Sequence, residues 1–255
     1  MFSATISDIR TFRAIMEAVQ ALIIDGNFYV SKEGLSLRAM DQSHAAMVDL
    51  NMKDSFFRDF ECEEDSFVCV SMEDLRKILA RVQKDDLVKL SLDSSRNSLI
   101  VELEGQSDSL FGKRTFIIPL KESDQQNIPA PDLPLDVKVK LQPSMLKEVV
   151  ADMGVVAQNV EIFANEDKIM FSTKSSGHEV KAELDKDKLL QLDTAEDANA
   201  SYGLEYLKNM VKLDALATEI TLEVATARPM RLTFQVDEDV TLRYLLAPYD
   251  EPEEE

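Results

Sequence analysis

Three polar side chains in the first fifth of the chain are of the types that form nucleophilic catalytic sites. Asp41, Ser43 and His44 lie close together, and a serine activated by a histidine and an aspartate can attack acyl groups. Residues this close in a turn between strands alternate in direction, however, and no glycine motif that would provide an oxyanion hole accompanies them. We therefore interpret Asp41 and Ser43 as residues that stabilise a turn by hydrogen bonding, and His44 as a contact for a binding partner.

Ligands for metals and cofactors are sparse in the rest of the chain. There are two histidines and two cysteines, and neither a phosphate-binding glycine motif nor an H-E-x-x-H zinc motif occurs. Cys62 and Cys69 fit neither a disulfide framework nor a zinc site, which predicts a reducing, intracellular environment. The acidic clusters at residues 63–65 and 85–86 lack histidine or cysteine support, so we interpret them as solvated turns. We expect no cofactor, no metal and no enzymatic activity.

Basic side chains recur at helical spacing although the protein as a whole is acidic. Its 255 residues include 48 Asp and Glu against 28 Lys and Arg, a formal charge of −20, which by default argues against nucleic-acid binding. Lys77, Arg81 and Lys84 nevertheless follow one another at spacings of four and three, which places them on one face of a helix. A single stripe of this kind is usually solvated surface, but basic positions occur on all four predicted helices. They are Arg10, Arg13, Lys77, Arg81, Lys84, Lys147, Lys208 and Lys212.

Four amphipathic segments interrupt a chain that is otherwise dominated by strand-like alternation. Apolar residues at spacings of three and four predict helices, over residues 8–23, 72–84, 143–156 and 203–212. Ser71 is predicted to cap the second helix, with Asp74 in the capping-box position. Pro143 is predicted to begin the third helix and Ser201 to cap the fourth. Short alternating runs bounded by turn residues surround each helix, which predicts antiparallel strands.

The order strand, helix, three strands occurs four times, in two similar halves. Residues 1–118 and 137–249 are therefore predicted to be two related α+β domains with helices on one face of antiparallel sheets. Residues 119–136 between them are predicted to be a linker, because most of this stretch lacks periodicity and is rich in proline. Residues 250–255 include five acidic side chains and are predicted to be a disordered tail. No apolar run is long enough for a membrane span or a signal peptide, so neither is expected.

Three separate motifs resemble those of one known family and follow one another along the chain in the same order. LRAMDQSHAAMVDL at residues 37–50 is similar to the A-M-D-x-S-H-V-x-L-V segment of the sliding clamps of the proliferating cell nuclear antigen family. YLLAP at residues 244–248, followed by an acidic tail, resembles that family's Y-L-A-P ending, and NIPAP at residues 127–131 falls in its linker. The chain is therefore identified as a member of this family with the DNA-clamp fold, and it looks similar to archaeal members.

The resemblance implies a ring of three subunits through which double-stranded DNA passes. The eight basic helix positions would face the DNA and contact phosphates only, so binding would be independent of sequence and the ring could slide. Such a protein is a processivity factor for DNA replication and repair. It would lie with the chromosomal DNA, in the cytoplasm of an archaeon or the nucleus of a eukaryote. An acidic exterior would repel DNA from every surface except the hole, so the asymmetry of charge matters more than its sum.

The resemblance also implies an apolar pocket for partner proteins on the front face of the ring. In the family, DNA polymerase, flap endonuclease, DNA ligase and the clamp loader insert a Q-x-x-h-x-x-a-a peptide, the PIP box, whose buried plug provides the affinity. The corresponding pocket residues in this chain are Met40, His44, Ala45, Met47, Ile128, Pro129, Leu133, Pro229, Leu246, Ala247 and Pro248.

Subunits of such a ring would join through the edges of their sheets. Residues 110–117 of one subunit would pair antiparallel with residues 177–183 of the next, and ring closure would remove both exposed edges. The interface residues would be Leu110, Phe111, Arg114, Phe116, Gly177, His178, Glu179, Val180 and Lys181. Two alternatives stay open: a subunit of a heteromeric clamp that forms a ring only with related chains, and an enzyme that acts on a small molecule. The lack of a nucleophile, metal or cofactor constellation argues against the enzyme.

Overall fold

A computed structural model describes residues 2–83, 86–105, 112–122, 128–129 and 131–249. The described residues fall into two compact units. The first lies within Met1–Gln42, Val48–Pro129 and Glu238–Leu242, and the second within Ser43–Met47, Ala130–Asp237 and Arg243–Glu255. Each unit contains two helices and the strands of two of the repeats predicted from the sequence.

The first half of the chain contains β1 (Phe2–Ile6), α1 (Ile9–Gln20), β2 (Asp25–Ser31), β3 (Gly34–Met40), β4 (Ala46–Lys53), the 3₁₀ helix η1 (Asp54–Phe56), β5 (Asp59–Cys62), β6 (Ser66–Ser71), α2 (Met72–Leu79), β7 (Asp86–Asp93), β8 (Ser98–Gly105) and β9 (Lys113–Pro119). The second half contains β10 (Val137–Leu141), α3 (Pro143–Met153), β11 (Asn159–Ala164), β12 (Lys168–Ser175), β13 (His178–Asp185), η2 (Lys186–Lys188), β14 (Gln191–Thr194), β15 (Ala198–Gly203), α4 (Leu204–Met210), η3 (Val211–Leu213), β16 (Glu219–Val224), β17 (Met230–Gln235) and β18 (Val240–Leu246).

Both units use the same strand orders. In the first unit the orders are β5-β1-β7-β8-β9 and β4-β3-β2-β6, and in the second they are β14-β10-β16-β17-β18 and β13-β12-β11-β15. β1 pairs antiparallel with β5 and β7, as β10 does with β14 and β16. The predicted plan of strand, helix and three strands is therefore confirmed, and so is the α+β class. The short strands β5 and β14 are additions that the sequence analysis missed.

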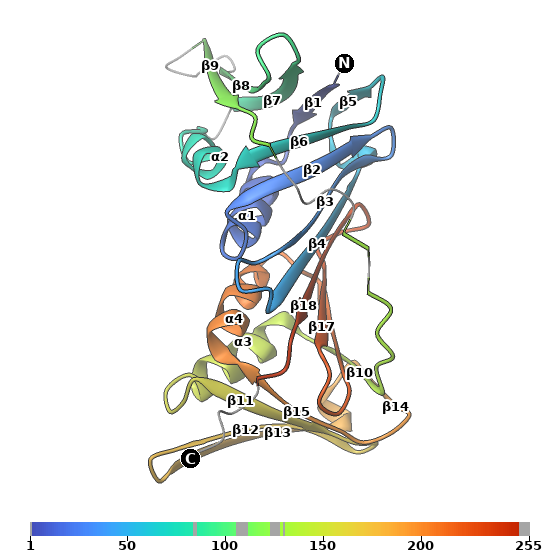
Figure 1. Cartoon of the computed structure of the whole chain (residues 1–255). Coiled ribbons are helices and arrows are strands. Elements are labelled where there is room, and N and C mark those ends of the chain that lie inside the picture. Colours follow the sequence, from blue (N-terminus) through green and yellow to red (C-terminus); the bar gives the residue numbers. More distant parts are fainter. Residues whose placement is uncertain (1, 84–85, 106–111, 123–127, 130, 250–255) are drawn as a thin grey trace. The chain divides into compact units, whose positions relative to one another are not determined.

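In each unit the two helices lie side by side and cover one face of the sheets (Figure 1). The reason is visible in α1, where Phe12, Ile15, Met16 and Val19 follow the helical spacing and are at most 1% exposed. Burial of such a stripe provides most of the stability of a short helix, because helices of this length are marginal in isolation. Strands alternate in the same sense, with one face on the core and one face outward. No helix among the described residues is long and apolar enough to cross a membrane.

All four predicted helices end earlier than the sequence suggested, and α1 ends at Gln20. α2 stops at Leu79, because the amide groups of Arg81 and Val82 bond three residues back, to Ile78 and Leu79, and tighten the chain into a turn. α4 stops at Met210 and continues only as the 3₁₀ turn η3. The α3 helix likewise ends at Met153, before residue 156.

The predicted helix caps have mixed outcomes. Ser71 is confirmed as the cap of α2, since its Oγ accepts a hydrogen bond from the amide of Asp74 at 3.2 Å. Pro143 is confirmed at the first turn of α3. The prediction for Ser201 was wrong. Ser201 lies inside β15, Gly203 precedes α4, and α4 has no side-chain cap.

Candidate functional site

The two basic positions on α1 differ in how accessible they are. Arg10 is exposed. Arg13 is half-buried, and its Nη2 donates a hydrogen bond to the carbonyl oxygen of Val82 at 3.2 Å. That carbonyl lies in the turn that follows α2, so Arg13 ties α1 to the end of α2. Arg10 is therefore the cation that α1 offers to a ligand.

The second predicted basic stripe is only partly helical. Lys77 lies on α2 and is exposed, and its ammonium group is 2.7 Å from the carboxylate of Glu73, one turn earlier. The hydrogen bond with Glu73 raises the pKa of Lys77, so this side chain is positively charged at neutral pH. Arg81 is exposed but lies in the turn beyond the helix, so the prediction that it shares a helix face with Lys77 was wrong. Lys84 lies outside the described residues.

In the second unit the basic positions come from α3, α4 and η3. Lys147 of α3 forms a surface ion pair of 3.0 Å with Asp214. Lys208 of α4 is exposed, and the end of its side chain lies next to Gly154, the residue that caps α3, so a Cβ at Gly154 would displace it. Lys212 is exposed on η3 and not on α4, where the sequence placed it.

These positions form a set of exposed charges suited to loose contacts with an anionic polymer. Arg10, Arg81, Lys208 and Lys212 have no ion pair with any described residue. The lysines of the pairs Lys77–Glu73 and Lys147–Asp214 are exposed, and exposed ion pairs are weak in water, so a phosphate can replace the carboxylate. Arg13 is the exception among the described positions because its guanidinium holds the fold together.

The segment containing His44 meets the C-terminal segment within the second unit. The amide of Ala247 donates to the carbonyl oxygen of Ala45 at 2.8 Å. Two residues further on, the amide of Tyr249 donates to the carbonyl oxygen of Ser201 at 2.7 Å. The bond between Ala45 and Ala247 brings together two motifs from opposite ends of the sequence, both of which contain predicted pocket residues.

The surfaces of the predicted pocket residues in this unit vary. His44 is exposed, and its backbone is left-handed, with φ 60°. Met47 and Leu246 are buried at the ends of β4 and β18. The remaining members are half-buried, namely Ala45, Leu133, Pro229, Ala247 and Pro248. Apolar surface is thus available on both sides of the bond between Ala45 and Ala247.

Three predicted pocket residues belong to the first unit. Met40 is half-buried at the end of β3, Ile128 is half-buried and Pro129 is exposed. The carbonyl oxygen of Ile128 accepts a hydrogen bond from Nη1 of Arg38 at 3.1 Å, and Nη2 of the same guanidinium bonds the carboxylate of Asp49 at 3.1 Å. Arg38 and Ile128 also line a cavity of about 230 Å³ on the outward side of β2, β3 and β4.

Arg38 is a positioning residue that the sequence analysis missed. Arg38 fixes the linker against β3. Its pairing with Asp49 could have been predicted, because an arginine and an aspartate occupy outward positions on two neighbouring strands. The contact with Ile128, 90 residues away in the chain, has no sequence signal of its own.

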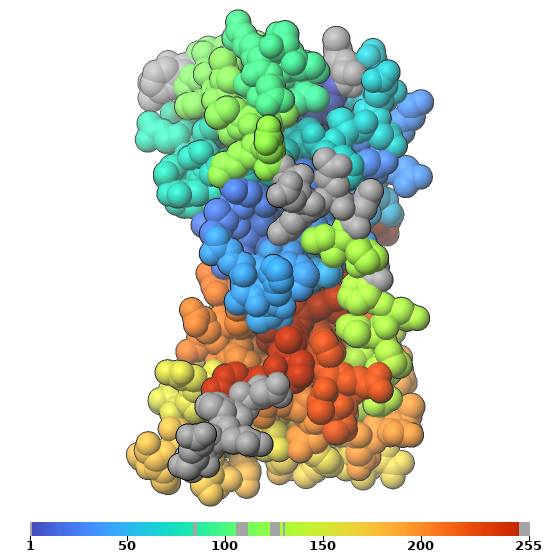
Figure 2. Space-filling view, in the orientation of Figure 1, coloured from blue at the N-terminus to red at the C-terminus, as the bar shows by residue number. Residues whose placement is uncertain are grey.

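The two strands predicted to join subunits are both edge strands. β9 is last in the order after β8, and β13 is last after β12, so no described strand pairs with the other side of either. Ile117 of β9 is 50% exposed, and β13 alternates between exposed and half-buried residues along its whole length (gold in Figure 2). Phe116 and Val180 are half-buried, and Gly177, His178, Glu179 and Lys181 are exposed. Leu110 and Phe111 lie outside the described residues.

Arg114, another predicted interface residue, is held by its own chain. Its guanidinium forms an ion pair with Asp86, whose side chain is fully buried, and donates to the carbonyl oxygen of Arg81 at 3.1 Å. Asp86 also accepts a hydrogen bond from the amide of Gln83 at 2.8 Å. The interpretation of Asp86 as part of a solvated turn was therefore wrong, because β8 and β9 bring Arg114 over it.

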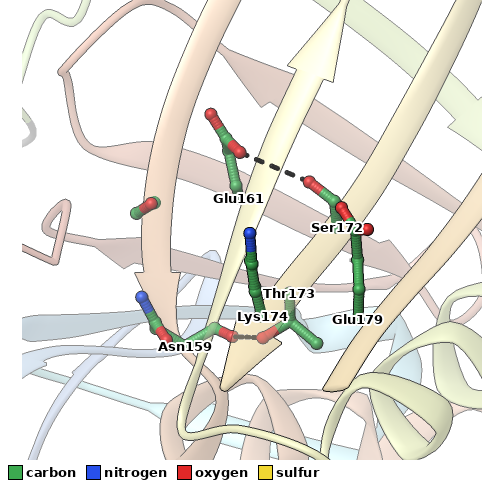
Figure 3. Close-up of a pocket in the computed structure, with 7 residues that line it drawn as sticks. Asn159, Glu161, Ser172, Thr173, Lys174 and Glu179 are labelled. Atoms are coloured by element: carbon green, nitrogen blue, oxygen red, sulfur yellow. Dashed lines mark hydrogen bonds between the residues drawn. The ribbon is translucent and has the colours of Figure 1, made fainter. Parts of the chain in front are cut away.

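A polar cavity of about 340 Å³ lies on the strands next to the β13 edge (Figure 3). Glu161 of β11 accepts a hydrogen bond from Ser172 of β12 at 3.3 Å, and Thr173 donates to the carbonyl oxygen of Asn159 at 2.7 Å. A hydrogen bond from Lys181 lowers the pKa of Glu179 at its rim. Among the described residues no cluster of His, Cys, Asp and Glu could hold a metal ion. Hydrogen bonds along the sheet thus occupy Glu161, Ser172 and Thr173.

Comparison with known proteins places the chain among DNA clamps. Residues 1–126 match the model of the N-terminal domain of proliferating cell nuclear antigen, and residues 129–249 match that of its C-terminal domain. A DNA polymerase sliding clamp of Thermococcus gammatolerans is 32% identical over 97% of this chain and 98% of its own length, and one of Pyrococcus horikoshii is 30% identical over the same shares. A crystal structure of PCNA from Thermococcus kodakaraensis superposes with a TM-score of 0.90 at 25% identity, covering 98% of this chain and all of that one.

Proposed function

The chain belongs to the proliferating cell nuclear antigen family of DNA polymerase sliding clamps, and we propose that it closes into a homotrimeric ring that encircles duplex DNA and tethers replication and repair enzymes to it. Members of this family are processivity factors and not enzymes. The protein therefore acts where chromosomal DNA is.

The observation that supports the ring most directly is the pair of uncovered sheet edges. By their places in the strand orders, β9 of the first unit corresponds to β18 of the second, and β13 corresponds to β4. Backbone hydrogen bonds inside each unit already join segments that flank β4 and β18: Ala247 to Ala45 in the second unit and Lys53 to Asp239 in the first. A β9 edge and a β13 edge from two subunits can repeat this arrangement. Head-to-tail pairing then uses both edges and closes without a free one.

The exposed cations of the helices support the proposal that DNA passes through the ring. Contacts between Lys or Arg and phosphates depend on charge and not on sequence, and they can be exchanged as the ring moves. Tight binding is unnecessary, because a closed ring is retained on DNA by topology. The proposed DNA-facing set is Arg10, Lys77, Arg81, Lys84, Lys147, Lys208 and Lys212. Arg13 is left out of it, because its guanidinium donates to the carbonyl oxygen of Val82.

The partner site is proposed around the meeting point of residues 43–47 with residues 246–248. It would take the apolar plug of a PIP-box peptide from DNA polymerase, flap endonuclease, DNA ligase or the clamp loader. The half-buried surface of Ala45, Ala247 and Pro248 is accessible without unfolding the chain, and burial of an aromatic anchor in such a pocket provides most of the affinity.

Retention on DNA tests the ring. The protein is loaded by a clamp loader onto a nicked circular plasmid, and half of the sample is then linearised. We expect the protein to stay on circles and to be lost from linear DNA. Equal retention on both would contradict topological linkage. Sedimentation of the chain alone tests homotrimer against heteromer, since a particle smaller than a trimer at micromolar concentration would favour the heteromeric clamp.

Calorimetry with a PIP-box peptide tests the partner site. Ala247→Asp introduces a charge beside the proposed plug and should abolish binding. Ala195→Asp is the matched control, because Ala195 is an exposed alanine of the same unit that lies outside the proposed site. Unaltered affinity of the Ala247→Asp variant would place the pocket elsewhere.

A further inference from the structure

His44 stands out because of its backbone conformation. Among the described residues, four that are not glycine have positive φ, and His44, at 60°, is the one that belongs to the proposed partner site. A residue with a Cβ is strained in this left-handed region, and it stays there only when its surroundings fix it. The residues on either side of His44 must therefore be held.

Two hydrogen bonds hold the flanks of His44, and both lie within the second unit. After it, the carbonyl oxygen of Ala45 accepts from the amide of Ala247 at 2.8 Å. Before it, Oγ of Ser43 is 2.6 Å from the phenolic oxygen of Tyr206, with either atom able to donate. The first bond is between backbone groups and survives most substitutions. The second depends entirely on two side chains that are 163 residues apart in the chain.

Tyr206 is well placed to act as an anchor because α4 is firmly packed. Leu204 and Leu207, on either side of Tyr206, are each 1% exposed. The amide of Leu204 also donates to the carbonyl oxygen of Gln158 at 2.8 Å, which fixes the start of the helix. A hydroxyl presented from such an element has little freedom to move. The exposed Ser43, in a loop, is the partner that it restrains.

We infer that Tyr206 is a positioning residue for partner binding: its hydroxyl holds Ser43, and thereby keeps His44 in the left-handed conformation in which its imidazole meets the partner's peptide. This inference rests on the proposed function, because it assumes that a PIP-box peptide binds at this loop. Tyr206 itself does not contact the peptide. Ser43 acquires a specific role in place of the general turn-stabilising one that the sequence suggested.

The first test is independent of any partner. His44 and His178 are the only histidines in the chain, so two imidazole Cε1–H signals are expected in a ¹H–¹³C NMR spectrum, and a His178→Gln variant assigns them. Tyr206→Phe and Ser43→Ala should each shift or broaden the His44 signal and leave that of His178 unchanged. Ser43→Thr retains the hydroxyl and should preserve the wild-type signal. An unchanged His44 signal in Tyr206→Phe overturns the inference.

The second test measures affinity for a PIP-box peptide by calorimetry. Loss of one hydroxyl hydrogen bond should weaken binding about fivefold in either Tyr206→Phe or Ser43→Ala. The double variant should be no weaker than either single variant, because both remove the same bond. Tyr249→Phe is the control and should bind as the wild type does, because Tyr249 is exposed and lines a cavity together with Tyr206 but has no assigned role in holding Ser43.

The outcomes separate the inference from the proposed function. If the wild-type protein binds the peptide and the Tyr206→Phe variant binds equally well, the positioning role is wrong and the clamp function stands. Additive losses in the double variant also contradict it, since the two hydroxyls would then act separately. If the wild-type protein does not bind the peptide at all, the proposed partner site fails, and the inference fails with it.

Discussion

The two units share one topology but hold the same turn by different chemistry. In the first, Ile6 pairs with Val88, and in the second Leu141 pairs with Ile220, so Asp86 and Thr218 occupy equivalent positions two residues earlier. Asp86 is buried and forms an ion pair with Arg114. Thr218 is exposed, and its amide and hydroxyl both bond the carbonyl oxygen of Gln235.

The contact that joins neighbouring helices is likewise more buried in the first unit than in the second. In the first unit the half-buried Arg13 donates to the carbonyl oxygen of Val82, whereas in the second the exposed Lys147 pairs with Asp214 on the surface. The fold therefore does not depend on a particular polar contact, since both solutions produce it. It depends on the apolar pattern of strands and helices that the two units share. The polar contacts decide which cations are committed to structure and which are available to a ligand.

The largest difference between the units is expected on loss of the buried carboxylate. Asp86→Ala leaves the guanidinium of Arg114, 19% exposed, without its carboxylate, and should lower the free energy of unfolding by about 3–5 kcal/mol. Thr218→Ala, at the equivalent position, removes a solvated hydroxyl and should lower it by less than about 1 kcal/mol. Urea unfolding followed by circular dichroism measures both.

The difference in stability between the Asp86→Ala and Thr218→Ala variants measures the contribution of the buried pair. If Asp86→Ala and Thr218→Ala lower the stability equally, the buried ion pair contributes no more to the free energy of unfolding than the hydroxyl of Thr218. Asp86→Asn with Arg114→Gln, which replaces the pair by neutral polar groups, should recover part of the loss, because no unpaired buried charge remains.

High pH should destabilise the second unit more than the first. Burial raises the pKa of both Tyr202 and Tyr244 above the ordinary value for tyrosine. Because the folded-state pKa is raised, the stabilising contribution is complete below about pH 10 and falls as pH rises further, by about 1.4 kcal/mol per pH unit for each tyrosine. At pH 11 the two together should cost roughly 2–3 kcal/mol.

Hydrogen exchange at pH 9 and pH 11, resolved by segment, locates this loss. We expect faster opening in β15 and β18, where the two tyrosines lie, than in the strands of the first unit. Tyr202→Phe removes one ionisable group and should halve the dependence on pH. Equal acceleration in both units would show that ionisation of these tyrosines does not govern the alkaline transition.

A smaller difference is expected between the two contacts that join neighbouring helices. Arg13→Ala removes the hydrogen bond to Val82 and should lower the free energy of unfolding by about 1–2 kcal/mol. Lys147→Ala removes a solvated ion pair and should change it by less than about 0.5 kcal/mol. Thermal unfolding of the two variants in parallel measures both changes in stability. A Lys147→Ala variant as unstable as Arg13→Ala would mean that the surface pair also holds the helices together.

The sequence predicted those features of the fold that repeat with a short period. Helix α1 and the strands with clear alternation follow from local spacing, and Ser71 was recognised as a cap because its partner, Asp74, is three residues away. The strands β5 and β14 were missed because four residues are too few to show a period. Helix ends were placed too late, since apolar spacing continues beyond α2 into a turn that still buries Val82.

Contacts between distant residues were beyond the reach of pattern analysis. The pair of Asp86 and Arg114 exists only because β7, β8 and β9 lie side by side. The bond between Ser43 and Tyr206 depends in the same way on tertiary structure. The family resemblance suggested which segments form the partner site, but it did not reveal how Ser43 or Arg38 is held.

The smallest effects are expected from charge reversal on the helices, and they test whether both units contribute to DNA binding. Lys208→Glu with Lys212→Glu changes two exposed cations of the second unit, and Lys77→Glu with Arg81→Glu changes two of the first. Each pair should reduce stimulation of a polymerase on primed circular DNA about threefold, because many interchangeable phosphate contacts remain. Lys77 already neighbours Glu73, so its reversal adds less repulsion than that of Lys208. The double variant Lys186→Glu with Lys188→Glu changes two cations of η2, which is not part of the proposed DNA-facing set, so it is the control and should leave stimulation unchanged. Equal loss in the control would mean that net charge, and not the helix surface, determines the response.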